Sequence, residues 1–448
     1  MGGVERQQDY VLRTVEERNI RFIQLWFTDV LGVPKAVNIT PAELENALEE
    51  GLSFDGSAID GFSRVQEADM LALPDAKTFQ ILPAQPDGVP VARVFCDITS
   101  LDGVPFEGDP RQVLRRQLER ARARGFTFFC SPDIEYFYFG SGDASAGPPT
   151  PLDQGSYFDL TTSGPATDLR KRTVLTLEEM GIPVEYSQHE DAPSQHEIDL
   201  RYTDALTMAD TVMTVRMVVK SLAEERGVHA SFMPKPLMGI QGSGMHTHLS
   251  LFEGDVNAFH DPTDEYGLSK VGRGFVGGLL RHAREITAVT NQLVNSYKRL
   301  VVGYEAPVYV AWARNNRSVV VNVPHAKRGK KESTRVEYRA PDPSCNPYLA
   351  FAVILAAGLR GVEDGYDLPP ETAANLYETT AEERMADGIT TLPGSLADAI
   401  DEMERSELVA DALGEHVFEW FIRNKRAEWR EYRTQVTSWE LGRYLPRM

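Results

Sequence analysis

The stretch Ser131-Pro132-Asp133-Ile134-Glu135-Tyr136-Phe137-Tyr138-Phe139 decides how this chain is interpreted. Its aromatic and β-branched content favours a strand. Asp133 and Glu135 alternate along it, so their side chains point to one face about 6.6–6.8 Å apart. Two adjacent carboxylates are costly to bury unpaired, and a divalent cation such as Mg²⁺ takes oxygen ligands of this kind. The alternative is a solvent-facing strand with ordinary acids.

A second acidic group follows at residues 185–199, Glu-Tyr-Ser-Gln-His-Glu-Asp-Ala-Pro-Ser-Gln-His-Glu-Ile-Asp. Pro193 disfavours a helix. We therefore expect Glu185, Glu190 and Glu197 to project from a loop and the edge of a strand. Taken by itself, the segment favours a charged surface loop over a functional site.

A third group spans residues 242–250, Gly-Ser-Gly-Met-His-Thr-His-Leu-Ser. Its two glycines let the backbone approach a ligand closely, and His246, His248 and Ser250 share one face of a strand. The two histidines could suggest zinc, but the evidence for zinc is weak because no cysteine lies nearby. A pair of structural histidines is the alternative.

A fourth group, Arg335-Val336-Glu337-Tyr338-Arg339, puts Arg, Glu and Arg on one face, where guanidiniums can grip an anion bidentately. A plain salt-bridge ladder is the alternative. Together the four groups supply acids and a histidine for hard cations and arginines for phosphate or carboxylate. That combination is typical of phosphoryl transfer.

The bulk composition excludes several classes of protein. A net charge of -20 over 448 residues argues against duplex DNA or an anionic membrane as the main partner. Cys96, Cys130 and Cys345 are far apart and form no CxxC pair, which indicates a reducing compartment. No stretch approaches the roughly 18 apolar residues of a membrane span. We expect a cytoplasmic protein.

The pattern of segments predicts an α+β chain of two domains, residues 1–104 and 105–448, divided in the Gly/Pro/Asp-rich stretch 100–110. Thr40-Pro41-Ala42-Glu43 predicts a capping box that opens a helix to about Glu50. The glycines of 272–277 match GxGxxG but lie within a helical pattern, so no dinucleotide loop is expected. Strands are predicted at 21–27, 36–39, 78–83 and 90–98, and helices at 109–124, 168–180, 205–226, 268–287, 346–363 and 394–428.

With these motifs in place, the whole chain resembles the class I glutamine synthetase family. The resemblance rests on order and spacing throughout, and the total length is similar to that of the compact alpha subtype. Tyr377 stands where the beta subtype is adenylylated, but its neighbours differ and that modification is not expected. The matching motifs are Phe54–Ser57, Asp133-x-Glu135, Gly155–Phe158, His189-Glu190, Gln195–Glu197, Phe232–Pro236, Gly242–His246, Asn295–Leu300, Gly303–Pro307, Asn316–Ser318 and Arg335–Arg339.

The resemblance implies an N-terminal β-grasp domain and a larger catalytic domain with an antiparallel sheet and helices. It also implies two stacked hexameric rings of identical subunits, with each active site shared between neighbours. The implied substrates are L-glutamate, ATP and ammonia or another amine, with Mg²⁺ (or Mn²⁺) as the cofactor. In the implied reaction, the glutamate γ-carboxylate takes the γ-phosphate of ATP, and the amine then displaces phosphate from γ-glutamyl phosphate.

The resemblance also implies roles for individual residues. Arg317 would stabilise the transferring phosphoryl group, and Glu305 would close over the intermediate. One metal would be held by Glu135, Glu190 and Glu197, and a second by Asp133, His246 and Glu337. ATP would be contacted by Glu185, His248, Ser250 and Arg317. Glutamate would be contacted by Gln241, Gly242, Arg299 and Arg339, and the amine by Asp55, Tyr157 and Glu190.

Four positions depart from the family pattern. Asp133 replaces a glutamate, Ala58 a serine, Ser194 a glycine and Asn322 an arginine. The metal frame survives these changes, whereas the amine pocket and the phosphate contacts are altered. The first expectation is an ammonia-using glutamine synthetase. The alternatives are γ-glutamylation of a larger amine, such as putrescine or spermine, and a non-catalytic structural or regulatory ring.

Overall fold

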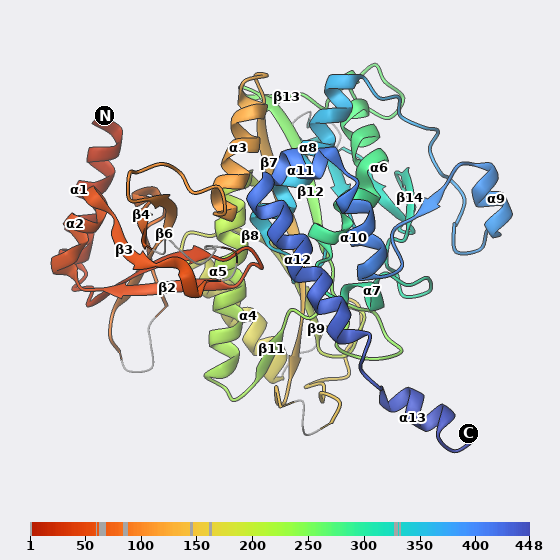
Figure 1. Cartoon of the computed structure of the whole chain (residues 1–448), viewed down its shortest axis with the longest axis horizontal. Helices are drawn as coiled ribbons and strands as arrows, with labels where there is room; N and C mark the ends of the chain where they lie inside the picture. Colours follow the sequence, from red (N-terminus) through yellow and green to blue (C-terminus); the bar gives the residue numbers. More distant parts are fainter. Residues whose placement is uncertain are drawn as a thin grey trace.

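The computed structural model describes residues 2–59, 61, 69–83, 88–143, 147–160, 164–326, 330 and 333–448, and these contain two separate sheet systems (Figure 1). The N-terminal sheet has six strands and lies with its helices at the left of Figure 1. Its elements are α1 (Gly2–Glu17), β1 (Phe22–Thr28), β2 (Pro34–Ile39), α2 (Pro41–Glu50), β3 (Leu52–Asp55), η1 (Gly56–Ala58), β4 (Asp69–Pro74), η2 (Ala76–Thr78), β5 (Gln80–Ile81) and β6 (Val91–Ser100).

The N-terminal sheet runs in the order β2-β1-β6-β4-β3, with β5 on β6. β1 and β6 are parallel and the other pairs are antiparallel. Ile23 and Leu25 of β1 are fully buried in a core that also holds Val11 of α1 and Leu44 of α2. Alternation along β1 thus selects the face that α1 and α2 cover, and this mixed layer confirms the predicted α+β character.

One local expectation for this region was wrong, and one helix was not predicted. Helix α2 begins where predicted, but the Thr40 side chain makes no capping hydrogen bond, so the capping box does not form. Helix α1 was not anticipated because its sequence is polar over most of its length. Among the side chains of α1 whose burial is described, those of Val11 and Val15 are buried, and such a narrow stripe is hard to separate from a polar leader by composition.

The larger sheet has eleven strands in the order β17-β14-β15-β16-β12-β7-β9-β8, with β10 and β11 on β7 and β13 on β12. Strands β7 and β12 form its centre. Its strands are β7 (Thr127–Phe139), β8 (Val184–His189), β9 (Gln195–Leu200), β10 (Thr203–Asp204), β11 (His229–Ser231), β12 (Met245–Glu253), β13 (Val256–Asn257), β14 (Tyr309–Ala313), β15 (Val319–Asn322), β16 (Val336–Tyr338) and β17 (Thr390–Thr391).

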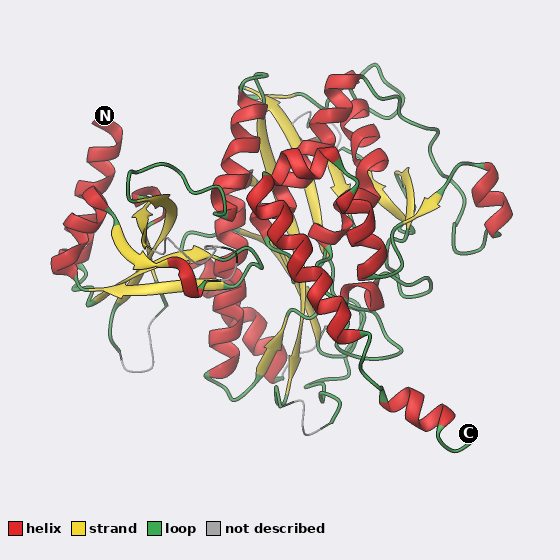
Figure 2. Cartoon of the chain, viewed as in Figure 1, coloured by secondary structure: helices red, strands yellow, loops and turns green. Residues whose placement is uncertain are grey.

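Helices pack in front of the larger sheet in the view of Figure 2, and α13 projects away from the body near the C-terminus. No helix among the described residues has the length and apolarity needed to cross a membrane. The helices are α3 (Pro110–Arg122), α4 (Pro165–Glu179), α5 (Ala205–Glu224), α6 (Lys270–Thr290), α7 (Ser296–Arg299), α8 (Pro347–Asp364), α9 (Ala381–Ala386), α10 (Leu396–Glu404), α11 (Glu407–Leu413), α12 (Glu415–Tyr432) and α13 (Ser438–Tyr444).

The single helix predicted at 394–428 is three helices, α10, α11 and α12. Ser406 accepts a hydrogen bond from the backbone N–H of Val409 and starts α11 as its N-cap. Gly414 then has φ +79°, which ends α11 and turns the chain into α12. Apolar residues recur at helical spacing across both breaks, so the hydrophobic period alone does not reveal them.

The GxGxxG segment lies inside α6, which confirms that it is not a nucleotide loop. Helices α6 and α8 pack closely because glycines face each other. A Cβ on Gly278 would collide with the backbone carbonyl of Ala357, and one on Gly361 would collide with the backbone of α6. These glycines therefore serve close helix packing.

A buried arginine connects the two sheet systems. The side chain of Arg111, at the start of α3, is only 4% exposed, and it contacts three carboxylates. Asp75 and Asp97 come from the N-terminal sheet, at 3.0 and 2.6 Å, and Asp210 comes from α5, at 2.9 Å. Removing Arg111 would leave three carboxylates with less compensation, so this cluster fixes how the N-terminal sheet sits on the larger unit.

Candidate active site

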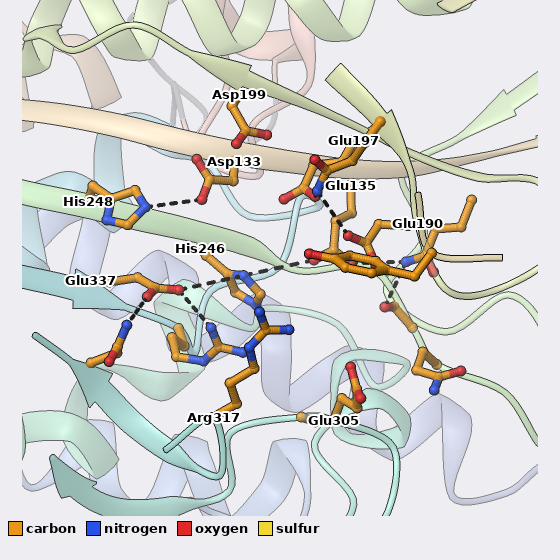
Figure 3. Close-up of a pocket in the computed structure, with 18 of the residues that line it drawn as sticks. Asp133, Glu135, Glu190, Glu197, Asp199, His246, His248, Glu305, Arg317 and Glu337 are labelled. Atoms are coloured by element: carbon orange, nitrogen blue, oxygen red, sulfur yellow. Dashed lines mark hydrogen bonds and ion pairs between the residues drawn. The ribbon is translucent and has the colours of Figure 1, made fainter. Parts of the chain in front are cut away.

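A cavity of about 300 Å³ opens beside the central strands of the larger sheet (Figure 3). Acidic side chains of β7 and β9 lie along one side of it, and Arg317 and Glu305 lie along the other. The predicted site residues that line it are Asp133, Glu135, Tyr157, Glu190, Glu197, Gln241, Gly242, His246, His248, Arg299, Glu305, Arg317, Glu337 and Arg339.

Strand pairing explains this convergence. β7 lies between β12 and β9. In this register Asp133 is opposite His246 on one side and Asp199 on the other, and Glu135 is opposite Glu197. Directly opposed residues share a face of the sheet. The alternation seen in each strand therefore becomes one continuous patch of ligating groups.

Burial raises the proton affinity of part of this acidic patch. The pKa of Glu135 is raised to about 8, first by burial and then by the nearby charge of Glu190. Burial and Glu135 raise the pKa of Glu197 well above its ordinary value. The pKa of Asp199 is raised to about 9 by burial and by Asp133. A divalent cation relieves such mutual repulsion, because it favours the ionised carboxylates.

Asp133 pairs with His248. Nε2 of His248 lies 3.2 Å from Oδ2 of Asp133, whereas Nδ1 of His246 lies 3.8 Å from Oε1 of Glu337. Burial lowers the pKa of His248, but Asp133 outweighs it and the net shift is upward. Burial and Arg339 lower the pKa of His246 well below its ordinary value. A neutral His246 is the form that can ligate a metal.

Glu337 is kept ionised by its neighbours. Nη1 of Arg339 donates to Oε1 at 2.7 Å, and Nδ2 of Asn322 donates to Oε2 at 2.6 Å. Burial acts to raise the pKa of Glu337, but Arg339, His248 and His246 outweigh it and hold that pKa well below its usual range. Asn322, one of the four departures, therefore supplies a neutral donor to Glu337.

The two arginines predicted to contact glutamate have different environments. Arg299 is buried, and its guanidinium donates to the backbone carbonyls of Arg339, Ala340 and Pro341. The guanidinium of Arg339 binds Glu337, and its Nε is buried without a hydrogen-bond partner. Arg299 thus braces the wall of the cavity, and Arg339 places positive charge beside the acids.

Arg317 and Tyr157 interact at the opposite side of the cavity. Burial acts to lower the pKa of Arg317, but the bond to Tyr157 outweighs it and raises the pKa. Glu305 lies on a loop between α7 and β14 and has φ +55°, which costs a non-glycine residue about 1–2 kcal/mol. Such strained positions cluster at ligand clamps and switch segments.

A second cavity of about 420 Å³ adjoins the first, and Glu185, His248 and Ser250 line it as the predicted nucleotide contacts. The two cavities share Asp133, Tyr186, Asp199, His248 and Arg335. Aromatic side chains of Phe129, Tyr186, Tyr202 and Phe252 contribute to its walls. The pair of cavities can therefore accept a flat ring on one side and phosphates at the acidic junction.

Asp55 is the predicted site residue that lines neither cavity, although the structure describes it. It ends β3 on the N-terminal sheet and is exposed, and its Oδ1 accepts a hydrogen bond from the backbone N–H of Ser57 at 2.8 Å. The departure at Ala58 lies beside it, but the side chain of Ala58 is outside the described part of the chain. Within one chain, Asp55 does not contribute to the cavity.

Asp199 and Gln195 are among the cavity residues to which the sequence reasoning gave no role. Asp199 follows Glu197 by two positions on β9, the same alternation that identified Asp133 and Glu135, so the signal was present in the sequence. Gln195 donates from Nε2 to Oε2 of Glu135 at 2.9 Å and holds that carboxylate in place. A buried glutamine gives no comparable signal in the sequence.

The oxygen-rich donor set fits a hard divalent cation. Ligand atoms of Asp133, Glu197 and Asp199 all lie within 4.8 Å of one another. Oδ1 of Asp199 is buried without a hydrogen-bond partner, which is costly unless a ligand binds it. Carboxylates with one or two imidazoles suit Mg²⁺ or Mn²⁺ better than the sulfur-rich sets of structural zinc.

Ser194 offers a test of another departure. Its φ is +59°, the conformation that a glycine would adopt without strain, and its Oγ accepts a hydrogen bond from the backbone N–H of Asp153 at 2.8 Å. Ser194→Ala keeps the strain and loses the bond, so we expect a loss of about 1–2 kcal/mol of stability. Ser194→Gly also loses the bond but relieves the strain, so it should be the milder variant. Thermal unfolding of the three proteins measures this, and an alanine variant at least as stable as the glycine variant would contradict it.

Comparison with known proteins adds independent information. The family model "Glutamine synthetase, catalytic domain" matches residues 107–444, and "Glutamine synthetase, beta-Grasp domain" matches residues 19–101. A protein named "Glutamine synthetase" from Mycolicibacterium smegmatis is 57% identical over 99% of this chain and 100% of its own. One of the same name from Thermotoga maritima is 50% identical over 97% and 98%. A solved structure titled "GmaS/ADP complex-Conformation 1" is 32% identical, has a TM-score of 0.86 and covers 97% of this chain and 99% of its own.

Proposed function

The chain belongs to the glutamine synthetase family, and on that premise we propose that it is an ATP-dependent ligase joining ammonia to the γ-carboxylate of L-glutamate. The observation that carries the proposal is one cavity in which acids for divalent cations face arginines for anionic substrates. Relatives at 50–57% identity bear the name glutamine synthetase, and this favours ammonia over a larger amine as the acceptor.

We assign the metal positions as the family resemblance suggests. Mg²⁺ or Mn²⁺ bound there supplies charge neutralisation for the ATP phosphates and the glutamate carboxylate. The raised pKa values of Glu135 and Asp199 support a cation at this patch, because they show carboxylates in need of positive charge. The proposed ligands are Glu135, Glu190 and Glu197 for one ion and Asp133, His246 and Glu337 for the other.

The substrate contacts follow from the two adjoining cavities. The aromatic walls of the second cavity support a nucleotide base there, with its phosphates directed toward Asp133. Arg317 then faces the transferring phosphoryl group from the opposite side and stabilises its developing charge. The proposed contacts are Glu185, His248, Ser250 and Arg317 for ATP, and Gln241, Gly242, Arg299 and Arg339 for glutamate.

The proposed reaction has two steps. An oxygen of the glutamate γ-carboxylate attacks the γ-phosphorus of ATP, which releases ADP and leaves γ-glutamyl phosphate. The amine nitrogen then attacks the acyl carbon, and inorganic phosphate leaves. Tyr157 and Glu190, with Asp55, bind ammonium and take its proton. Closure of the segment that carries Glu305 excludes water, which would otherwise hydrolyse the acyl phosphate.

The same proposal includes a domain boundary between residues 104 and 105, a cytoplasmic location, and assembly of identical subunits into two stacked hexameric rings. The three unpaired cysteines support a reducing compartment. Trp439 and Leu445, in and next to the projecting α13, are 60% and 73% exposed, which supports contact with another subunit. Asp55 lines neither cavity of its own chain, which supports a site shared between subunits.

An assay with a panel of amines tests the proposal. With glutamate, ATP and Mg²⁺, we expect saturable phosphate release with ammonium and at least about tenfold lower kcat/KM with putrescine or spermine. The reason is that the chain has all the residues proposed to bind ammonium, Asp55, Tyr157 and Glu190. Turnover with a diamine and none with ammonium would instead establish the larger-amine alternative. Calorimetry that detects no Mg²⁺-dependent nucleotide binding would favour a non-catalytic ring.

A further inference from the structure

Asp153 forms a polar cluster with His189, Ser194 and His196 that lines neither of the two cavities. We call this group the Asp153 cluster. Oδ1 of Asp153 accepts hydrogen bonds from Nε2 of His189 at 2.9 Å, from the backbone N–H of Ser194 at 2.8 Å and from that of Gly155 at 3.1 Å. The backbone N–H of Asp153 donates in return to Oγ of Ser194 at 2.8 Å. One carboxylate thus connects its own loop with His189 and with the backbone of Ser194.

Both imidazoles of the cluster have close polar partners. Nδ1 of His189 lies 2.6 Å from the carbonyl oxygen of Glu190, and its Nε2 lies 2.9 Å from Oδ1 of Asp153. Nδ1 of His196 faces Nη1 of Arg170 at 2.8 Å. Asp153 and His189 thus form a close pair.

Ligand atoms of Asp153, His189 and His196 lie within 4.8 Å of one another, close enough to hold a metal ion. Hydrogen bonding within the cluster explains its arrangement better than a bound metal ion does. Each ring nitrogen of His189 already has a hydrogen-bond partner, and the guanidinium of Arg170 lies against His196. Both features disfavour a cation, and they point to a structural ion pair.

The cluster joins two segments that carry cavity residues. The loop 153–158 carries Tyr157, and the turn after β8 carries Glu190. Gly155 packs directly on the His189 ring, where a Cβ would collide with it. The backbone N–H of Phe158 donates to the carbonyl oxygen of His189 at 3.1 Å. The positions of Tyr157 and Glu190 thus depend on the same ion pair.

We propose that Asp153 is a positioning residue for the amine site, which sets the separation of Tyr157 and Glu190 by holding His189 and the loop at Gly155 together. The inference rests on the proposed function, in which these two side chains bind ammonium. A ligand as small as ammonium contacts few groups, so a displacement of about 1 Å in one of them weakens binding strongly. Outer-layer residues that orient such groups typically contribute 10–100-fold.

The test compares Asp153→Ala and Asp153→Asn with Asp159→Ala as a matched control in the same loop. Asp159 accepts a hydrogen bond from the backbone N–H of Ser156 at 2.8 Å and is exposed. In Asp153→Ala we expect the KM for ammonium to rise about tenfold or more and the KM for ATP to stay within about twofold. ATP hydrolysis without amide formation should also increase. Asp153→Asn keeps an acceptor oxygen, so its KM for ammonium should lie between those of the wild type and Asp153→Ala. The Asp159→Ala control should match the wild type.

Several outcomes overturn the inference: equal rises in both KM values, unchanged kinetics in Asp153→Ala, or stoichiometric zinc bound at the Asp153 cluster in the purified protein. If melting curves show that Asp153→Ala does not fold, His189→Gln removes the imidazole while keeping Asp153, and it should show the same split between the two KM values. A wild-type protein that lacks ammonium-dependent turnover rejects the proposed function itself. Active wild type with an unaffected Asp153→Ala rejects only this inference.

Discussion

Glu337→Ala is expected to lower kcat for ATP-dependent phosphate release by about 10³-fold, and His246→Ala should have an effect of the same order. Glu337 is buried, ionised and in contact with Arg339, and it faces His246 across the acidic cavity. In the proposed reaction both side chains hold the cation beside the ATP phosphates. Their removal takes away charge stabilisation of the transferring phosphoryl group and leaves most core packing intact.

Two further variants separate this effect from loss of structure. Glu337→Gln keeps the size of the side chain but not its charge, so it should be nearly as inactive as alanine while melting close to the wild type. Glu371→Ala breaks an ion pair with Arg314 that lines neither cavity, and it should retain full activity. Wild-type-like turnover in Glu337→Ala or His246→Ala would remove the basis for the metal assignment.

Metal-free protein is expected to lose stability as the pH rises from about 6 to about 8, and Mg²⁺ should suppress this loss. The pKa of Glu135 in the folded protein is about 8, above its ordinary value of 4.5, and that of Asp199 is about 9 against 3.8. A folded state that binds the proton more tightly than the unfolded state is stabilised at low pH. That contribution is lost as the pH rises through the folded pKa.

Melting temperatures near pH 6 and pH 8, with a chelator and with Mg²⁺, measure this linkage. The gain from Mg²⁺ should be larger at pH 8, because a bound cation stabilises the ionised carboxylates and adds its own binding free energy to folding. Calorimetry in two buffers of different ionisation enthalpy should show protons released on binding. Asp199→Asn should weaken the pH dependence. An equal gain at both pH values, with no proton release, would contradict the assignment.

Strand patterns were largely predictable from the sequence. The alternation of Asp133 and Glu135 predicted a strand with both acids on one face, and β7 confirms it. His246 and His248 likewise share a face of β12, and the GxGxxG segment lies in a helix as expected. Side-chain direction in a strand follows from the period of two alone, so local sequence is sufficient to determine it.

Helix boundaries and the polar network around Asp153 were harder to predict from the sequence. The segment 394–428 keeps one hydrophobic period across two breaks, and only the cap at Ser406 and the left-handed Gly414 divide it. The ion pair of Asp153 and His189 joins residues 36 positions apart. Nothing in either local sequence indicates the other, since such a pair forms only when packing brings the two segments together.

By itself, the sequence determined which residue types were available and which face of each strand they occupy, and its resemblance to a known family indicated their roles. Only the tertiary structure decided which of them meet. The strand order β16-β12-β7-β9 sets Glu337 opposite His248 and places His246, Asp133 and Asp199 in one row, and so it adds Asp199 to the predicted acidic residues. The physical reason is that register between distant strands depends on the packing of the whole sheet, whereas alternation within one strand depends on backbone geometry alone.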